Sequence, residues 1–252
     1  MIIVSGHQPV YLPWLGLFHK LSLCDKFVYM DTVQYLDGDW NNRNKIKTPN
    51  NEFMLSVPVN KKETQGKNLN EIKIFKNLTN PKEFWQRKHW ESIKINYKKA
   101  FYFDDYADDF EKMYSSQEWD NLSDICWYQF NYFIKCLDLN DVEIIRMSQT
   151  KFEGQKDNLI LNHCKKLNAS AVVFGSQGRN YVDIDKFNKE KKYVYFQDYK
   201  HPIYKQRFSG FLSNLSVIDL LFNCGPNSRE ILLSNNISKK DLKSSNFWHN
   251  KF

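Results

Sequence analysis

The first 47 residues constrain the fold most, because apolar runs alternate there with a polar loop that contains two prolines. Residues 1–4 are a short apolar run of the strand type. The prolines lack a backbone N–H and fix φ, so the strand ends before them. Residues 15–23 then place apolar side chains at helical spacing, and residues 26–30 form a second apolar strand. The loop after the first strand is therefore expected at the carboxyl edge of a sheet, where open α/β folds bind ligands.

The rest of the chain repeats this alternation of strands and helices. Residues 142–147, 169–174 and 193–197 are apolar runs that predict strands, with a helix expected between the first two. Residues 52–59 alternate well enough to form a strand that pairs with the region of Lys45. We therefore predict an α/β fold with a largely parallel sheet and helices on both faces.

The same patterns suggest the domain organisation. Residues 1–235 are predicted to form a single α/β domain, since a chain of this length can bury a sizeable core. The stretch from about 76 to 140 is mostly helical in pattern, and it is predicted to be an insertion over the sheet. Residues 236–252 are expected to be a peripheral C-terminal tail.

The net charge of the chain limits the kinds of ligand and partner that can be expected. The chain carries a formal net charge of +7. Solvated lysine-rich faces explain this most simply, and a basic cleft for an anionic substrate such as a nucleotide-sugar is the second interpretation. The basic residues are dispersed and no nucleic-acid recognition motif is present, so no nucleic-acid partner is expected.

Cysteine usage and hydropathy predict the compartment. The five cysteines are scattered and form no CxxC pair, which favours reduced thiols over a disulfide framework or a zinc site. The six histidines lie apart as well, so no metal site is expected. No apolar run approaches the ~20 residues of a membrane span, and no secretory signal pattern opens the chain. A cytoplasmic protein without a membrane span is expected.

Five motifs together resemble the WbqC-like protein family: HQPVYLPWLG, DTVQY, WNNRNKIK, HPIYKQ and LSVIDLLFNCG. They occur in the expected order between about residues 3 and 226, and the set is specific. The family is found among bacterial genes for O-antigen, a part of lipopolysaccharide, and for other surface polysaccharides. The resemblance implies an enzyme that transfers glycine, or a similar acyl group, to the amine of a nucleotide-linked deoxyamino sugar.

Three histidines and one carboxylate are the candidate catalytic residues. His7 follows the first strand and titrates near physiological pH, which suits a general base that takes the proton of the amine. Asp31 follows the second strand and would orient the imidazole of His7. His201 is a rival base, and the resemblance adds His89, which lies on a predicted helix. The simplest structural alternatives are a strand-end cap for His7, a turn-forming Asp31 and a packed His89.

Polar and aromatic side chains in these loops are the candidate substrate-binding residues. Arg43 and Lys47 would bind phosphate, because two cationic groups in one loop suit an anionic ligand. Aromatic members of the set would stack on a sugar or a base, and a glycine-bounded turn at 175–178 would cradle a phosphate through its backbone. The full set is Gln8, Tyr11, Trp14, Gln34, Asn42, Arg43, Asn44, Lys47, Ser176, Tyr181, Tyr204, Gln206 and Asn223.

The sequence leaves three functions open. Acyl transfer needs an activated carboxyl group, and ATP with magnesium is a candidate activator, because ligases that form acyl-adenylates also open with a strand, a histidine-bearing loop, a helix and a second strand. The HxGH motif of those ligases is absent, and Gly16 and His19 are the residues nearest to it. A glycosyltransferase-like enzyme that holds a metal-bound nucleotide-sugar near Asp31 is the second function. A non-catalytic carbohydrate-binding protein of the assembly pathway is the third.

Overall fold

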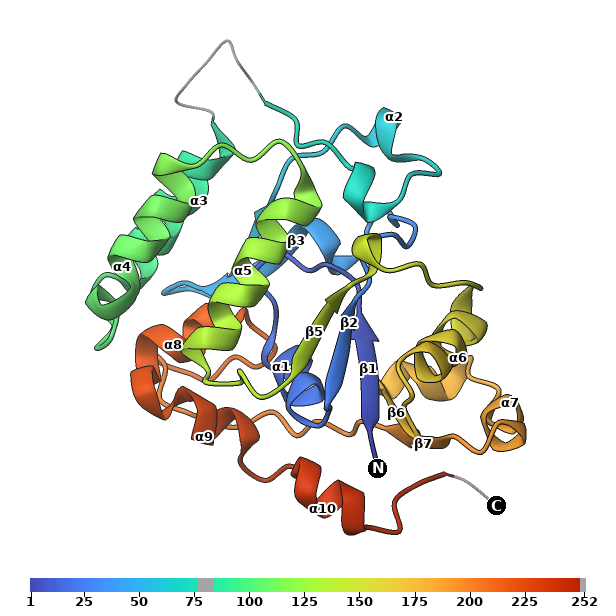
Figure 1. The fold of residues 1–252 in the computed structure, drawn as a ribbon. Coiled ribbons are helices and arrows are strands. Elements are labelled where there is room, and N and C mark those ends of the chain that lie inside the picture. The colour runs from blue at the N-terminus through green and yellow to red at the C-terminus, as the bar shows by residue number, and fades with distance from the viewer. Residues whose placement is uncertain (77–83, 250–252) are drawn as a thin grey trace.

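A five-stranded parallel sheet forms the centre of the computed structural model, which describes residues 1–76 and 84–249 (Figure 1). The predicted α/β fold with a largely parallel sheet is confirmed. Each strand forms where a short apolar run lies between polar turns. In spatial order the strands are β5 (Glu143–Arg146), β2 (Lys26–Tyr29), β1 (Ile3–His7), β6 (Ala171–Phe174) and β7 (Tyr193–Phe196).

Helices cover both faces of this sheet. On the first face, Phe27 of β2 stacks on Phe130 of α5, with ring centroids 5.7 Å apart. On the second face, Phe174 of β6 packs edge-on against Phe187 of α7 at 5.5 Å. The helices of the first core are α1 (Leu15–Ser22), α5 (Leu122–Cys136) and α8 (Val217–Cys224), and those of the second are α6 (Lys156–Lys166) and α7 (Ile184–Lys189).

The chain between β2 and β5 leaves the sheet and returns to it through α5. Its first part is the antiparallel hairpin that the alternation around Lys45 predicts. The elements of this stretch before α5 are β3 (Arg43–Lys47), β4 (Glu52–Ser56), α2 (Lys61–Thr64), α3 (Trp85–Tyr97), α4 (Asp104–Glu111) and a π-helical turn (Lys112–Ser116).

The predicted helical insertion is not clearly separate from the rest of the fold. Phe110 of α4 contacts Phe133 of α5 and Phe222 of α8, with ring centroids 6.3 and 5.2 Å apart. These rings belong to the same apolar cluster as the first face of the sheet. The helices after residue 84 therefore form a layer that is continuous with the main core, and residues 77–83 of the predicted insertion lie outside the described residues.

The last two helices of the described chain are short: the first lies beside α8 and the second lies below the amino-terminal ends of the strands (Figure 1). They are α9 (Ser228–Leu233) and α10 (Lys239–Ser244). Lys239 donates a 2.9 Å hydrogen bond to the carbonyl oxygen of Cys24, and Lys243 forms an ion pair with Asp25. The predicted peripheral tail thus contains a docked helix, and its residues 250–252 lie outside the described part of the chain.

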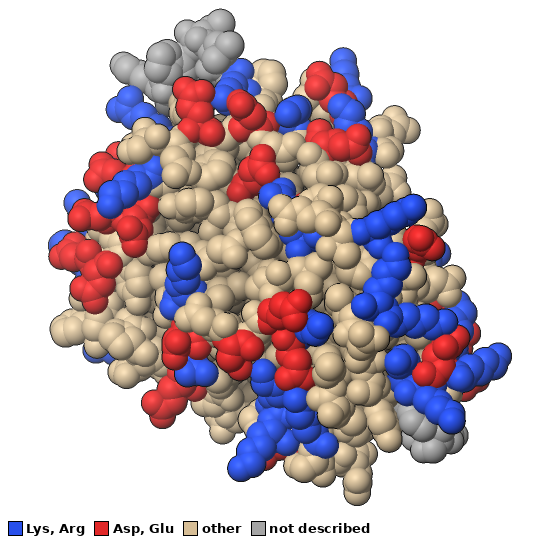
Figure 2. Space-filling view, in the orientation of Figure 1, with Lys and Arg blue, Asp and Glu red and all other residues tan. Residues whose placement is uncertain are grey.

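Charged residues of both signs are interspersed on the face shown in Figure 2, where lysines and arginines lie beside aspartates and glutamates. Surface ion pairs such as Lys165–Glu190 join opposite charges in the same way. Within residues 1–76 and 84–249, every helix is too short or too polar to cross a bilayer.

Candidate functional site

The strand order creates a topological switch point between β1 and β6. From β1 the chain adds β2 and β5 on one side and then β6 and β7 on the other. Pairing of β1 with β2 runs as far as His7, and pairing of β6 with β7 runs as far as Phe174. The last register pair between β1 and β6 in the described sheet is Val4 with Val172, so backbone pairing between these two strands ends before their carboxyl ends, and the Ser5 hydroxyl donates a 2.6 Å hydrogen bond to the carbonyl oxygen of Val173 just beyond it. Doubly wound sheets bind ligands at this position.

We call this region the switch-point edge and define it by His7, Gln8 and residues 175–177. A side chain built at Gly175 would meet no atom within 4 Å, so there is open space beside the backbone at the end of β6. The next two residues, Ser176 and Gln177, are exposed. The turn predicted to cradle a phosphate therefore lies at the same edge as His7, and Tyr181 lies just beyond it with 58% of its surface exposed.

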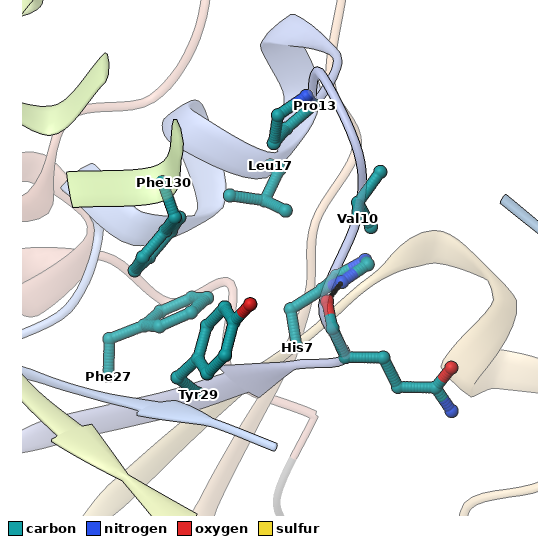
Figure 3. A pocket seen from close by; sticks show the side chains of 8 residues that line it. His7, Val10, Pro13, Leu17, Phe27, Tyr29 and Phe130 are labelled. Atoms are coloured by element: carbon teal, nitrogen blue, oxygen red, sulfur yellow. Dashed lines mark hydrogen bonds between the residues drawn. The ribbon is translucent and has the colours of Figure 1, made fainter. Parts of the chain in front are cut away.

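The His7 imidazole is held in place by apolar side chains. It lines a pocket that is too narrow to hold a water molecule (Figure 3). Its Nδ1 lies 2.8 Å from the carbonyl oxygen of Gln8, which can only accept, so Nδ1 carries the proton and Nε2 keeps its lone pair. The other residues that line the pocket are Gln8, Val10, Pro13, Leu17, Phe27, Tyr29 and Phe130.

His7 is partly exposed at the sheet edge, and the loss of solvation around its ring controls its charge. Its pKa is lowered to about 3, first by burial and then by the positive charge of Lys20, while the hydrogen bond to Gln8 acts in the opposite direction. The imidazole is therefore neutral at physiological pH and presents Nε2 as an acceptor. Lys20 was not predicted as a site residue, although its position three residues after Leu17, on the buried side of α1, was visible in the sequence.

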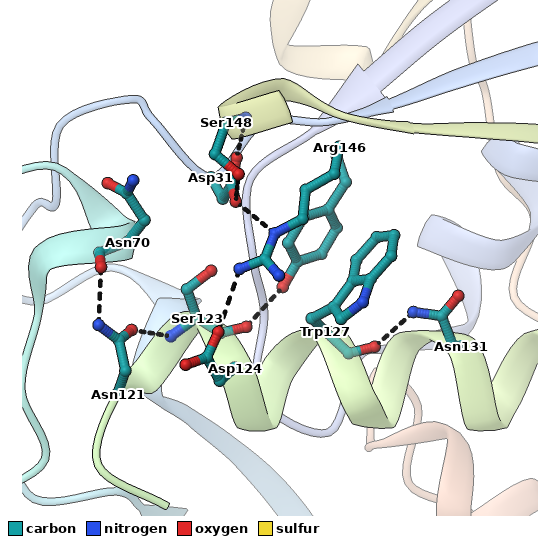
Figure 4. Close-up of polar contacts among 10 residues, drawn as sticks. Asp31, Asn70, Asn121, Ser123, Asp124, Trp127, Asn131, Arg146 and Ser148 are labelled. Carbon is teal, nitrogen blue, oxygen red and sulfur yellow. Dashed lines mark hydrogen bonds and ion pairs between the residues drawn. The ribbon is translucent and has the colours of Figure 1, made fainter. Parts of the chain in front are cut away.

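Asp31 does not contact His7. Its carboxylate is fully buried and accepts hydrogen bonds from Arg146 Nε at 2.7 Å, from the Ser148 hydroxyl at 2.7 Å and from the Ser148 backbone at 2.8 Å (Figure 4). Arg146 also pairs with Asp124 and stacks over the ring of Trp127. Asp31 thus anchors the end of β5 to the end of β2, and Gln8 supplies the partner that Asp31 was expected to provide for His7.

Polar side chains that follow Trp40 hold the loop after β1 in place through hydrogen bonds. Asn44 donates to the carbonyl oxygen of Leu12 at 2.6 Å, and Asn41 donates to Gln8 Oε1 at 3.2 Å and to the carbonyl oxygen of Pro9 at 2.8 Å. Two further predicted residues bond locally, Asn42 to the carbonyl oxygen of Val57 and Arg43 to that of Gly38.

Tyr11 and His89 belong to one buried hydrogen-bond network. The Tyr11 hydroxyl lies 2.7 Å from His89 Nδ1 and also contacts the Tyr114 hydroxyl, which Gln129 bonds in turn. Burial lowers the His89 pKa to about 3, so this ring is neutral and its Nδ1 accepts from Tyr11. This network connects the loop after β1 to α3, the π-helical turn and α5. It places His89 away from the switch-point edge.

A second buried cluster forms around Asp219 of α8. Its carboxylate accepts from Tyr97 at 2.8 Å, Tyr204 at 2.9 Å and Gln206 at 2.8 Å. Burial raises the Asp219 pKa despite these hydrogen bonds. Lys47 Nζ bonds Gln206 Oε1 at 2.9 Å and two backbone carbonyl oxygens. The predicted substrate residues Lys47, Tyr204 and Gln206 thus join β3, α3 and α8, and their polar atoms are used within the protein.

The remaining predicted residues lie near these clusters. His201 stacks on Tyr204 with centroids 6.3 Å apart, and its Nδ1 bonds the carbonyl oxygen of Pro202. Trp14 packs edge-on against Tyr199 at 5.8 Å. Asn223 donates to the carbonyl oxygen of Asp219 at 2.6 Å, and Gln34 is exposed after β2.

The structure therefore brings together His7, Gln8 and Ser176 at one edge of the sheet. It places most of the other predicted residues in buried hydrogen-bond clusters that connect separate segments of the chain. The pocket beside His7 is lined by neither Arg43 nor His201. His19, one of the two residues nearest to the ligase motif, is buried, accepts from Gln197 at Nδ1 and bonds the carbonyl oxygen of Ile237. Among residues 1–76 and 84–249, no group of three metal-ligating side chains lies together.

A second cavity of about 490 Å³ lies between α3 and the π-helical turn. Its size suits a small ligand. Trp90 and Gln86 lie in its lining but are almost fully buried, and Lys94 there is paired with Glu91. This cavity is the alternative candidate for the ligand-binding site, beside the switch-point edge.

The model of the WbqC-like protein family matches residues 8–231. The "Uncharacterized protein Rv1507c" of Mycobacterium tuberculosis (strain ATCC 25618 / H37Rv) is 30% identical over 226 residues, which cover 89% of this chain and 95% of that protein. No solved structure matches the chain.

Proposed function

We propose, from the premise that this chain belongs to the WbqC-like protein family, that it is an enzyme of surface-polysaccharide biosynthesis. In its specific form, the proposal is transfer of glycine or a similar acyl group to the amine of a nucleotide-linked deoxyamino sugar. We place the reaction in the cytoplasm, which agrees with five cysteines that are all free thiols.

One observation carries the proposal: a neutral histidine with a free acceptor nitrogen stands at the carboxyl end of β1, beside the point where β1 and β6 part. Gln8 holds His7 Nδ1 as the donor, so Nε2 is the nitrogen that can accept a proton. No protein atom in the described residues donates to His7 Nε2. The open space at Gly175 supports the approach of a substrate from the β6 side.

Amide formation requires few groups from the protein. The amine nitrogen attacks the carbonyl carbon of an activated acyl group, an N–C bond forms, and the C–O bond to the leaving group breaks with its electron pair. The nitrogen then loses a proton, which His7 Nε2 is placed to accept. Backbone N–H groups of residues 176–177 would hold a phosphate of the donor or of the nucleotide. ATP with magnesium is the proposed source of the activated carboxyl group.

The test supplies ATP, magnesium, glycine and a nucleotide-linked deoxyamino sugar to the purified protein. We expect release of pyrophosphate and a sugar product that is heavier by one glycyl group, detected by mass spectrometry. Release of a nucleoside diphosphate with transfer of the sugar would instead show a glycosyltransferase. Binding of the nucleotide-sugar without any product, under every donor tried, would contradict an enzymatic role and favour a carbohydrate-binding protein.

A further inference from the structure

We propose that the ammonium group of Lys20 binds one anionic group of the ligand at the switch-point edge, either a carboxylate or a phosphate. Lys20 lies on α1 and only 6% of its surface is exposed. Its side chain reaches back along the helix, as helical lysines do, to the end of β1. There Nζ donates a 3.0 Å hydrogen bond to the carbonyl oxygen of Gly6, the residue before His7.

The buried ammonium group of Lys20 has no anionic partner in the described residues. Within the described residues, Gly6 supplies the one hydrogen bond to Lys20 Nζ, and no carboxylate lies within ion-pair distance. A buried charge is normally paired, because the loss of hydration must be offset by an opposite charge. A lone carbonyl oxygen does not provide that charge, so the site is short of one anion.

Lys47 shows how the same fold satisfies a buried lysine. It is 2% exposed, and its Nζ has three acceptors, in Gln206, Phe208 and Gly210. The carboxylate of Asp219 lies close enough to Lys47 for that charge to oppose the rise in the Asp219 pKa that burial causes. Lys20 is also buried but has one acceptor and no such carboxylate, which distinguishes a binding group from a structural one.

The groups around Lys20 do not supply the missing charge. Cys24 is the nearest acidic group, but burial raises its pKa to about 12, so it is a neutral thiol at physiological pH. The carboxylate of Asp31 already accepts hydrogen bonds from Arg146 and Ser148. His7 is neutral and its Nδ1 bonds Gln8. A ligand is therefore the proposed source of the counter-charge.

An anion at Lys20 would also alter His7. The Lys20 charge is the second largest cause that lowers the His7 pKa. A bound carboxylate or phosphate would cancel this charge and move the His7 pKa back toward its ordinary value. The ligand would thus make Nε2 a stronger base when the substrate is in place.

Two sources of this anion fit the proposed reaction: the activated carboxyl donor and the diphosphate of the nucleotide-sugar. The inference deepens the proposed function and rests on it for the place of the substrate. The two can nevertheless fail separately, because anion binding at Lys20 is measurable without any turnover.

The experiment measures binding of three probes, inorganic phosphate, acetate and uridine diphosphate, by calorimetry to the wild-type chain and to Lys20→Met and Lys20→Arg. Lys240→Met is the matched control, since it removes one exposed lysine and the same unit of charge. We expect Lys20→Met to weaken the best probe at least tenfold, and Lys20→Arg and Lys240→Met to stay within threefold of the wild type. Acetate as the best probe would indicate the acyl donor, and uridine diphosphate would indicate the nucleotide.

The His7 pKa is a second readout that does not depend on the Lys20 variants folding. Nuclear magnetic resonance of the wild-type imidazole should show a higher pKa with inorganic phosphate or uridine diphosphate bound than without it, since both remain anionic where His7 titrates. Equal affinity in wild type and Lys20→Met, or absence of binding by all three probes to the wild type, would overturn the proposal. A His7 pKa that the bound probe leaves unchanged would overturn it as well.

Discussion

Lys20 and His7 meet at the end of β1: the Lys20 ammonium bonds the carbonyl oxygen of Gly6, and its charge helps to keep the neighbouring imidazole of His7 neutral. The relation links a helix on the first face of the sheet to the strand at the switch point. It gives the proposed acyl-transfer site one neutral acceptor and one unpaired cation. Around these two residues, the buried clusters of Asp31 and Asp219 hold the surrounding strands and helices together.

Replacement of His7 should remove turnover and preserve the fold. We expect His7→Asn to lower kcat by about 10²-fold or more, because the side chain keeps a donor for Gln8 and loses the acceptor nitrogen. His249→Asn changes an exposed histidine near Phe196 and should keep wild-type kcat. Initial rates of glycyl-sugar formation give the comparison, and a His7→Asn enzyme with the wild-type kcat would exclude His7 as the base.

The burial of Lys20 should appear in the pH dependence of stability. Its pKa is lowered from 10.5 to about 8 by burial. The unfolded chain therefore binds the proton more tightly between pH 8 and 10.5, and the wild type gains stability as pH rises through this window. Below pH 8 the full cost is present, about 3 kcal/mol.

Lys20→Met lacks this titration. Its advantage over the wild type in the free energy of unfolding should be largest below pH 8 and should shrink toward pH 10.5. Urea unfolding of both proteins at several pH values measures the difference, and Lys240→Met provides the control without a buried charge. A difference that is constant across the window would mean that Lys20 has an ordinary pKa in the folded protein.

Loss of Arg146 should destabilise the fold through Asp31. Arg146→Met leaves the fully buried carboxylate with only the Ser148 bonds, and a cost of about 3–5 kcal/mol is expected. The exposed pair of Arg229 and Asp138 offers the matched control, for which Arg229→Met should cost about 1 kcal/mol or less. Denaturant unfolding gives both values, and equal small losses would show that Asp31 does not depend on Arg146.

Tyr204 tests whether the cluster around Asp219 is structural. Tyr204→Phe removes one hydrogen bond to a buried carboxylate and should cost about 1–3 kcal/mol. KM for the sugar should stay at the wild-type value, because the hydroxyl is used inside the protein. Tyr181→Phe, at an exposed position, is the stability control. A raised KM together with an unchanged free energy of unfolding would indicate that Tyr204 binds the substrate.

The sequence predicted the sheet well because its strands are short apolar runs with clear ends. The segment 142–147 gave β5, and the alternation near Lys45 gave the hairpin. α4 lies within the stretch from about 76 to 140 that was predicted to be mostly helical, and its Tyr106 and Phe110 show the four-residue spacing of a helical face that packs on the core. Its own bounds were not predicted.

The site was harder to predict, because partners depend on contacts between distant segments. Nothing in the order of residues shows that Asp31 bonds a residue 115 positions later, or that Lys47 bonds one 159 positions later. Arg146 could have been suspected as a charge at the end of an apolar strand. The loop position of His7 was readable, whereas its partner depended on the local path of the backbone at Gln8.

The most direct test of the central claim is a crystal structure of the protein with a nucleotide-linked deoxyamino sugar. We predict that the ligand lies at the carboxyl ends of β1 and β6, with its amine beside His7 Nε2 and an anionic oxygen within hydrogen-bond distance of Lys20 Nζ. A ligand bound instead in the cavity between α3 and the π-helical turn, with the switch-point edge unchanged, would contradict the account.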